Sequence, residues 1–103
     1  MTLTSDFHPE ARAEFFAAID WYDERQIGLG ERFEAAVAAA LDSSLLWPEW
    51  APVWPGWQHE PMVRSRPVPG FPSRVVLLIS ADELTVIAVA HAKRKPGYWR
   101  HRA

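Results

Sequence analysis

The sequence contains no cysteine, which excludes disulfides and thiolate metal sites. Its apolar runs stay far below the roughly 18 residues that suggest a membrane-spanning helix. The opening MTLTSDFHPE has neither the basic start nor the apolar stretch of a secretory signal. We therefore expect a soluble, cytoplasmic protein without a membrane partner. With 103 residues, about half of them apolar, we expect one domain over residues 1–103 with one core.

The motifs of several enzyme classes are also missing. The four histidines show no helical pair spacing of the kind that binds a metal ion. There is no glycine-rich phosphate loop and no serine-nucleophile motif. We therefore expect neither a metal nor a cofactor.

The net charge of −2 conceals a strong difference between the two parts of the chain. Residues 1–63 hold three arginines and eleven carboxylates, a net charge of −8, whereas residues 64–103 hold eight lysines and arginines and two carboxylates, a net charge of +6. This asymmetry favours an anionic partner for the C-terminal part. The alternative is that the two parts attract each other within the folded protein.

Two segments have the apolar periodicity of amphipathic helices. Pro9 suits the first position of the first helix, which the Gly-Leu-Gly turn at 28–30 ends, and the second helix fades before Pro48. The apolar stripes consist of Ala11, Phe15, Ala18, Ile19 and Tyr22, and of Phe33, Ala36, Val37, Ala40 and Leu41. The short connection predicts an antiparallel helix hairpin.

Residues 47–61, WPEWAPVWPGWQHEP, are predicted to form an irregular loop because four prolines interrupt any regular helix or central strand. The loop carries Trp47, Trp50, Trp54 and Trp57. These side chains could form an aromatic binding platform. The favoured interpretation is that they cover an exposed edge of the core.

Three β-forming segments follow, at 63–68, 74–80 and 85–90, and residues 3–7 are a candidate N-terminal edge strand. The order β-α-α-β-β-β predicts an α+β domain in which the helix hairpin packs on one face of a small antiparallel sheet. The other face is then left to carry function. We expect the core to contain Phe15, Ile19, Phe33, Val37, Leu41, Ile79, Ile87 and Val89.

Alternation along the first of these strands places Arg64 and Arg66 on one face. If 85–90 is an inner strand, its end carries the basic run 93–95 to the rim of that face, where the arginines would complete a cationic groove. Guanidinium groups bind phosphate or carboxylate through paired hydrogen bonds, and the Tyr-Trp pair at 98–99 could stack on a base or pack against an apolar helix.

His91 is the nearby side chain best suited to move protons at neutral pH. Alternation puts it on the same face as Ile87 and Val89. This placement favours a buried, hydrogen-bonded structural histidine over a proton shuttle.

Fragments along nearly the whole chain occur in an order and spacing that resemble one protein family. They are F-H-P-E-A at 7–11, W-Y at 21–22, G-L-G-E-R-F at 28–33, the helix-ending Pro48, Arg64 seven residues before Phe71-Pro72, and the closing pattern His91-x-x-Arg94-x-Pro96-x-Tyr98-Trp99-x-x-Arg102. This pattern resembles the RelE/ParE superfamily of toxins from type II toxin–antitoxin modules, in its ParE-like, plasmid-stabilisation branch. Relatives usually have tyrosines where this chain has Ser73 and Leu77, so no role of those tyrosines carries over.

The resemblance implies a growth-arresting toxin and leaves its mode of action open. ParE-like members are associated with poisoning DNA gyrase by binding, which we favour because the net charge is −2 and both tyrosines are absent. RelE-like members cut messenger RNA on the ribosome; Arg64 and Arg94 would then hold the transition-state charge and Tyr98 would donate a proton or stack on a base. An inactive relative is the third possibility.

Both toxin interpretations imply a cognate antitoxin, whose acidic, amphipathic segment would complement the basic C-terminal part. The residues expected to bind the target or the antitoxin are Arg64, Arg66, Lys93, Arg94, Lys95, Tyr98, Trp99, Arg100 and Arg102.

Overall fold

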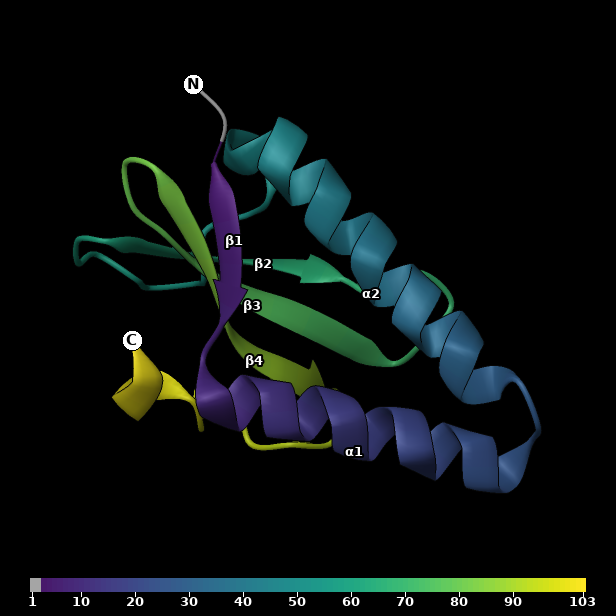
Figure 1. Ribbon diagram of the computed structural model, residues 1–103. Helices are drawn as coiled ribbons and strands as arrows, with labels where there is room; N and C mark the ends of the chain where they lie inside the picture. The colour runs from purple at the N-terminus through teal and green to yellow at the C-terminus, as the bar shows by residue number, and fades with distance from the viewer. Residues whose placement is uncertain (1–2) are drawn as a thin grey trace.

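The computed structural model describes residues 3–103, in which two helices pack on a four-stranded sheet (Figure 1). The elements are β1 (Thr4–Phe7), α1 (Pro9–Arg25), α2 (Leu29–Leu46), the 3-10 helix η1 (Pro48–Trp50), β2 (Met62–Pro67), β3 (Ser73–Ile79), β4 (Glu83–His91) and the 3-10 helix η2 (Arg100–Arg102). This confirms the expected α+β class and the order β-α-α-β-β-β. None of the helices within 3–103 is long and apolar enough to cross a membrane.

The strand order across the sheet is β1-β4-β3-β2. β2, β3 and β4 pair antiparallel, whereas β1 runs parallel to β4. The sheet is therefore mixed and not wholly antiparallel. Both helices, β2 and β3 lie between β1 and β4 in the chain, and a long connection of this kind permits parallel pairing.

The helix hairpin begins and turns where the sequence predicts. Pro9 is the first residue of α1, and the preceding His8 accepts a hydrogen bond from the Glu10 amide at its Nδ1 atom. Gly28 adopts a φ of 85°, which favours glycine. Gly30 lies so close to α1 that a Cβ atom at this position would be 2.5 Å from the carbonyl oxygen of Ile19. The Gly-Leu-Gly turn therefore permits both the reversal and the close packing of the two helices.

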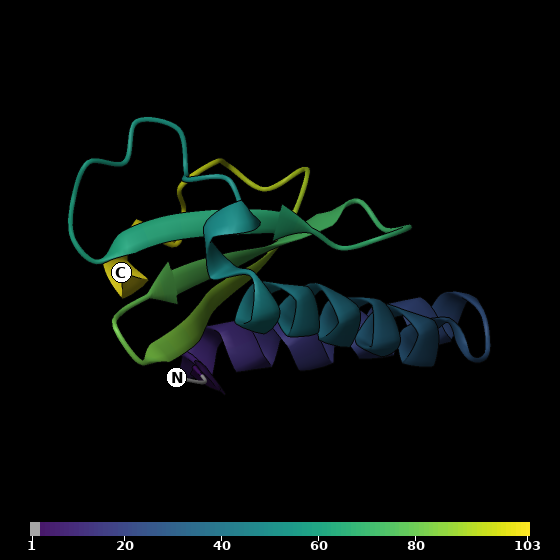
Figure 2. The same cartoon turned by 90° about the horizontal axis from the view of Figure 1, so that it is seen from above.

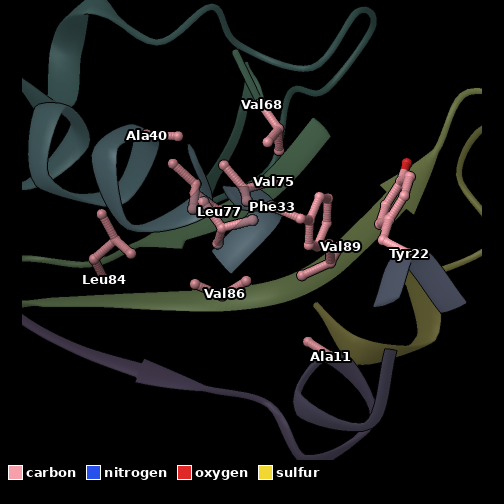
Figure 3. Close-up of a cluster of buried hydrophobic side chains, with 11 residues drawn as sticks. Ala11, Tyr22, Phe33, Ala40, Val68, Val75, Leu77, Leu84, Val86 and Val89 are labelled. Carbon is pink, nitrogen blue, oxygen red and sulfur yellow. The ribbon is translucent and has the colours of Figure 1, made fainter. Parts of the chain in front are cut away.

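The main core lies between the helix hairpin and one face of the sheet (Figure 3). Its buried members are Ala11, Tyr22, Phe33, Val37, Ala40, Val68, Val75, Leu77, Leu84, Val86 and Val89. Of the eight expected core residues, Phe33, Val37, Ile87 and Val89 are buried, and Phe15, Ile19, Leu41 and Ile79 are partly buried against this cluster.

A second buried cluster covers the opposite face of the sheet. It consists of Val63, Val76, Ile87, Ala88 and Trp99, with Trp54, Trp57, Leu78, Ala90 and Tyr98 packed against it. Figure 2 shows the helices on one side of the sheet, and the loop before β2 and the chain after β4 on the other. The expectation that this face is left open for function is therefore wrong, because apolar strand residues on both faces require cover.

The tryptophans of the 47–61 loop divide into two pairs. Trp54 and Trp57 pack on the second cluster, as the favoured interpretation of the loop predicts. Trp47 and Trp50 are exposed and stack on each other with ring centroids 4.9 Å apart. The core-cover interpretation thus holds for only one pair.

A β-bulge in β4 changes which side chains share a face. Val76 pairs with Ala88 but the next residue, Leu77, pairs with Val86, so Ile87 is the extra residue. Ile87 and Ala88 consequently both join the second cluster, and Val89 returns to the helix side. The prediction that His91 shares a face with Ile87 is wrong for this reason; alternation from Val89 places it on the helix side.

Candidate partner-binding site at the end of β4

Glu14 of α1 is the centre of a network that fixes the C-terminal residues to the helix. Its carboxylate accepts hydrogen bonds from the Val89 amide at 3.0 Å, the Tyr98 hydroxyl at 2.8 Å and the Arg102 guanidinium at 3.1 Å. Arg94 lies 4.0 Å from the same carboxylate. Glu14 therefore links α1 to the end of β4 and to the C-terminal residues 98–102.

Arg102 is held inside this network and is not available to a partner. Its side chain is only 7% exposed, forms ion pairs with Glu10 at 2.7 Å and Glu14 at 3.1 Å, and donates to the Ile87 carbonyl at 3.0 Å. Burial opposes its charged form, but the hydrogen bond and charge of Glu14, followed by the charge of Glu10, raise the pKa of Arg102 overall. These contacts bring the C-terminus beside the start of α1, as Figure 1 shows.

His101 adds an exposed contact to the same helix. Its Nε2 atom lies 3.0 Å from Glu10 Oε2. The hydrogen bond from His101, helped by Arg102, holds the pKa of Glu10 below its usual value. Part of the C-terminal positive charge is thus satisfied within the protein, as the second interpretation of the charge asymmetry states.

Tyr98 is partly buried between two arginines. The Arg94 guanidinium carbon lies 3.9 Å from the ring centroid and that of Arg102 lies 5.3 Å from it. Burial, followed by the hydrogen bond to Glu14 and the charge of Glu14, raises the pKa of Tyr98 well above the ordinary tyrosine value. The phenol is therefore a weaker proton donor than an ordinary tyrosine.

The raised pKa of Tyr98 predicts a pH effect on stability. The protonated phenol is favoured in the folded state, so its contribution is complete below the unfolded pKa of about 10 and is lost as the pH rises through the folded value. Tyrosinate absorbance, taken as the difference between the parent protein and Tyr98→Phe, should appear at a higher pH than in an unfolded sample, and at a lower pH in Glu14→Gln than in the parent. Ionisation of Tyr98 at the ordinary value would contradict this.

Arg94 and His91 each line two cavities at the end of β4. The first, of about 380 Å³, lies on the helix side and is lined by Glu14, Ala17, Ala18, Trp21, Tyr22, Ser73, Val89, His91 and Arg94. The second, of about 270 Å³, lies on the opposite face and includes Arg74, Arg94, Lys95, Tyr98 and Trp54 in its lining. Both are lined by the exposed Arg94, so this end of the sheet presents positive charge to an anionic group.

Arg64 and Arg66 lie elsewhere. They pair with Leu77 and Val75, two residues of the main core, so they project from β2 toward the helix side. Arg64 donates hydrogen bonds to the carbonyls of Glu49 at 3.3 Å and Ala51 at 2.7 Å, directly after α2. Neither arginine lines the two cavities that Arg94 lines. The expected groove shared by Arg64, Arg66 and residues 93–95 therefore does not form. Both arginines lie on the helix side of β2, and Arg64 is also held by backbone carbonyls.

The remaining candidates differ in exposure. Lys93, Arg94, Lys95 and Arg100 are exposed and can contact a partner. Trp99 is 1% exposed, because it packs in the second cluster against Trp54 and Trp57. His91 is partly buried, and its Nδ1 accepts a hydrogen bond from the Lys93 amide at 3.0 Å.

Two residues of the candidate site were not identified from the sequence. Arg74 lines the far-face cavity, and its position on the face of Ser65, to which it donates at 3.2 Å, follows from strand alternation. The sequence points to Glu14 less clearly. Its only mark is that it lies four residues after Glu10, on the same face of the helix. Residues 3–103 contain no group of three or more acidic or histidine side chains that could hold a metal ion.

No protein-family model matches the chain, and no curated protein matches it by sequence. Among solved structures, one chain of a structure described as "Chromosomal ParDE TA system from P. aeruginosa" has a TM-score of 0.65 and 15% sequence identity to this protein. The alignment covers 87% of this chain and 96% of that chain. The two chains thus share a fold, in agreement with the resemblance to the RelE/ParE superfamily.

Proposed function

We propose that this protein is the toxin of a type II toxin–antitoxin module, that it arrests growth by binding DNA gyrase, and that a cognate antitoxin neutralises it. Two independent features support the toxin assignment. The ParE-like motifs run in order from residue 7 to Arg102, and the fold is similar to that of a chain from a ParDE system.

The state of the side chains available for acid–base chemistry favours binding over catalysis. The Tyr98 hydroxyl donates a hydrogen bond to Glu14, and its pKa is raised. His91 has one ring nitrogen engaged by the Lys93 amide. RNA cleavage needs a group that removes a proton and a group that donates one, whereas an inhibitor that binds gyrase needs only an exposed surface. Here Lys93, Arg94, Lys95 and Arg100 are exposed and supply such a surface.

Replacing Arg94 by alanine should abolish growth arrest and leave the melting temperature nearly unchanged. The side chain is 55% exposed and its ion pair with Glu14 is 4.0 Å long, so it contributes little to stability. Arg32→Ala removes the same charge from an exposed position on α2 and is the matched control. Induction from a tight promoter in cells without antitoxin measures the arrest. If Arg94→Ala unfolds the protein, or arrests growth as the parent does, the surface is wrongly assigned.

Cleavage of messenger RNA is the alternative to gyrase binding, and one structural observation favours it. The far-face cavity brings Arg74, Arg94 and Lys95 together beside Tyr98, and cations next to an aromatic ring suit a phosphate and its base. The induction experiment separates the two modes of action. An SOS response and DNA breaks before any loss of messenger RNA support gyrase binding. Early codon-positioned cuts that disappear in Arg74→Ala and Tyr98→Phe would support the nuclease.

The proposed antitoxin carries an acidic, amphipathic segment. The exposed cations at the end of β4 favour such a partner, because opposite charge accelerates association and apolar contact supplies affinity. Coexpression of the adjacent gene should restore growth, and raising the salt concentration should slow association of the two purified proteins.

A further inference from the structure

The helix-side cavity has features that a gyrase-binding surface does not require. We propose that it binds a segment of a partner polypeptide that presents a large apolar side chain next to a carboxylate. Its volume of about 380 Å³ falls within the range of ligand-binding pockets. The inference goes beyond the proposed binding of gyrase, which needs exposed cations at the end of β4 but no cavity.

The walls of this cavity are mainly apolar. Ala17, Ala18, Trp21 and Tyr22 line it from α1, and Val89 lines it from β4. The two alanines leave space between the helix and the strand, and Trp21 remains 49% exposed. An apolar side chain placed here would remove this surface from water, which is favourable.

The polar groups of the lining can donate hydrogen bonds to an anion. Because His91 Nδ1 accepts from the Lys93 amide, the neutral imidazole carries its proton on Nε2 and is a donor there. Ser73 contributes a hydroxyl that can donate. Arg94 is 4.0 Å from Glu14, too far for a hydrogen bond, so its guanidinium N–H groups remain available. Lys93, two residues after His91, is exposed and adds a positive charge to this segment.

Glu14 is the one acidic residue in this lining, and its charge is compensated. Its oxygens accept from Val89, Tyr98 and Arg102, at distances between 2.8 and 3.1 Å. A carboxylate has about four acceptor positions, and these contacts occupy most of them. Glu14 therefore neither attracts a cationic ligand nor prevents an anionic one from reaching Arg94. An apolar wall beside donors and positive charge selects an apolar residue with a neighbouring carboxylate.

Two blocked dipeptides test the chemistry of the site directly. The first has phenylalanine followed by glutamate, and the second has phenylalanine followed by glutamine, so that they differ only in charge. Titration of the purified, isotope-labelled protein should shift the amide resonances of Ala17, Ala18, Val89 and His91 with the glutamate dipeptide. The glutamine dipeptide should bind about tenfold more weakly, as expected for the loss of hydrogen bonds to a charged group.

Two pairs of variants separate the apolar and the charged parts of the site. Ala17→Leu fills the cavity from an exposed helix position and should abolish binding, whereas Ala13→Leu, one turn earlier and outside the lining, should not. Arg94→Gln should remove the preference for glutamate over glutamine, and Lys93→Gln should reduce it only slightly. Equal affinities for the two dipeptides, or binding that survives Ala17→Leu, would overturn the inference. Neither result would bear on growth arrest or on gyrase.

Discussion

Replacing Trp99 by alanine should lower the free energy of unfolding by about 3–5 kcal/mol, as truncation of a large buried aromatic does. Trp99 is 1% exposed and is the largest fully buried side chain in the described part of the chain. Its ring packs edge-on against Trp54, with centroids 4.9 Å apart. Loss of the ring would expose the second cluster and release the C-terminal segment. Urea unfolding followed by circular dichroism measures the change.

Trp50→Ala is the matched control, because it truncates the same residue type at a position that is 70% exposed. It should cost about 1 kcal/mol or less, mainly the stacking on Trp47. If Trp99→Ala costs no more than Trp50→Ala, the C-terminal segment does not pack on the sheet as described.

The second large effect is expected for Glu14→Ala, which should destabilise the protein by about 3–5 kcal/mol. The substitution leaves the Arg102 guanidinium, whose side chain is 7% exposed, without one of its two carboxylate partners. It also removes the acceptor of the Val89 amide and the Tyr98 hydroxyl. A buried charge that loses its partner costs more than the intact pair contributes.

Glu24→Ala is the control for this prediction. Glu24 pairs with Arg25 at 4.0 Å on the surface of the same helix, and loss of an exposed pair costs about 0–1 kcal/mol. Glu14→Gln keeps the shape and tests the charge alone. A Glu14→Ala protein as stable as Glu24→Ala would show that the network does not hold the C-terminus to α1.

The helices and the main core could be predicted because local patterns determine them. Apolar spacing along 11–22 and 33–41 marks the buried stripes, and Pro9 and the glycines at 28 and 30 mark the ends. Both helices and the element order follow from the sequence for this reason. The parallel pairing of β1 depends on a partner strand some 80 residues away and has no local signal.

The bulge at Ile87 shows why alternation alone put Ile87 on the same face as Val89 and His91. A single extra residue reverses the facing of every later position in the strand. Ile87 looks like any other apolar residue in 85–90, so nothing in the sequence marks it as the extra one. Alternation grouped Arg64 with Arg66 correctly, but it could not decide that their face is the one covered by the helices.

The candidate site was predicted only in part, because the closing segment folds back onto the protein. Arg94 and the lysines beside it are exposed, as a binding surface requires. Trp99 and Arg102 belong to the same basic and aromatic segment. Their side chains are nevertheless buried against β4 and α1. The partner of Arg102 is Glu14, 88 residues earlier. Spacing within the segment carries no information about a contact at that separation.

Inhibition of gyrase supercoiling by the purified protein tests the central proposal most directly. A toxin that acts by binding should block supercoiling of relaxed plasmid at concentrations near that of the enzyme, and Arg94→Ala should fail to do so while Arg32→Ala inhibits as the parent does. The cognate antitoxin should relieve the block. Undiminished supercoiling at a large excess of folded protein would contradict the proposed mode of action.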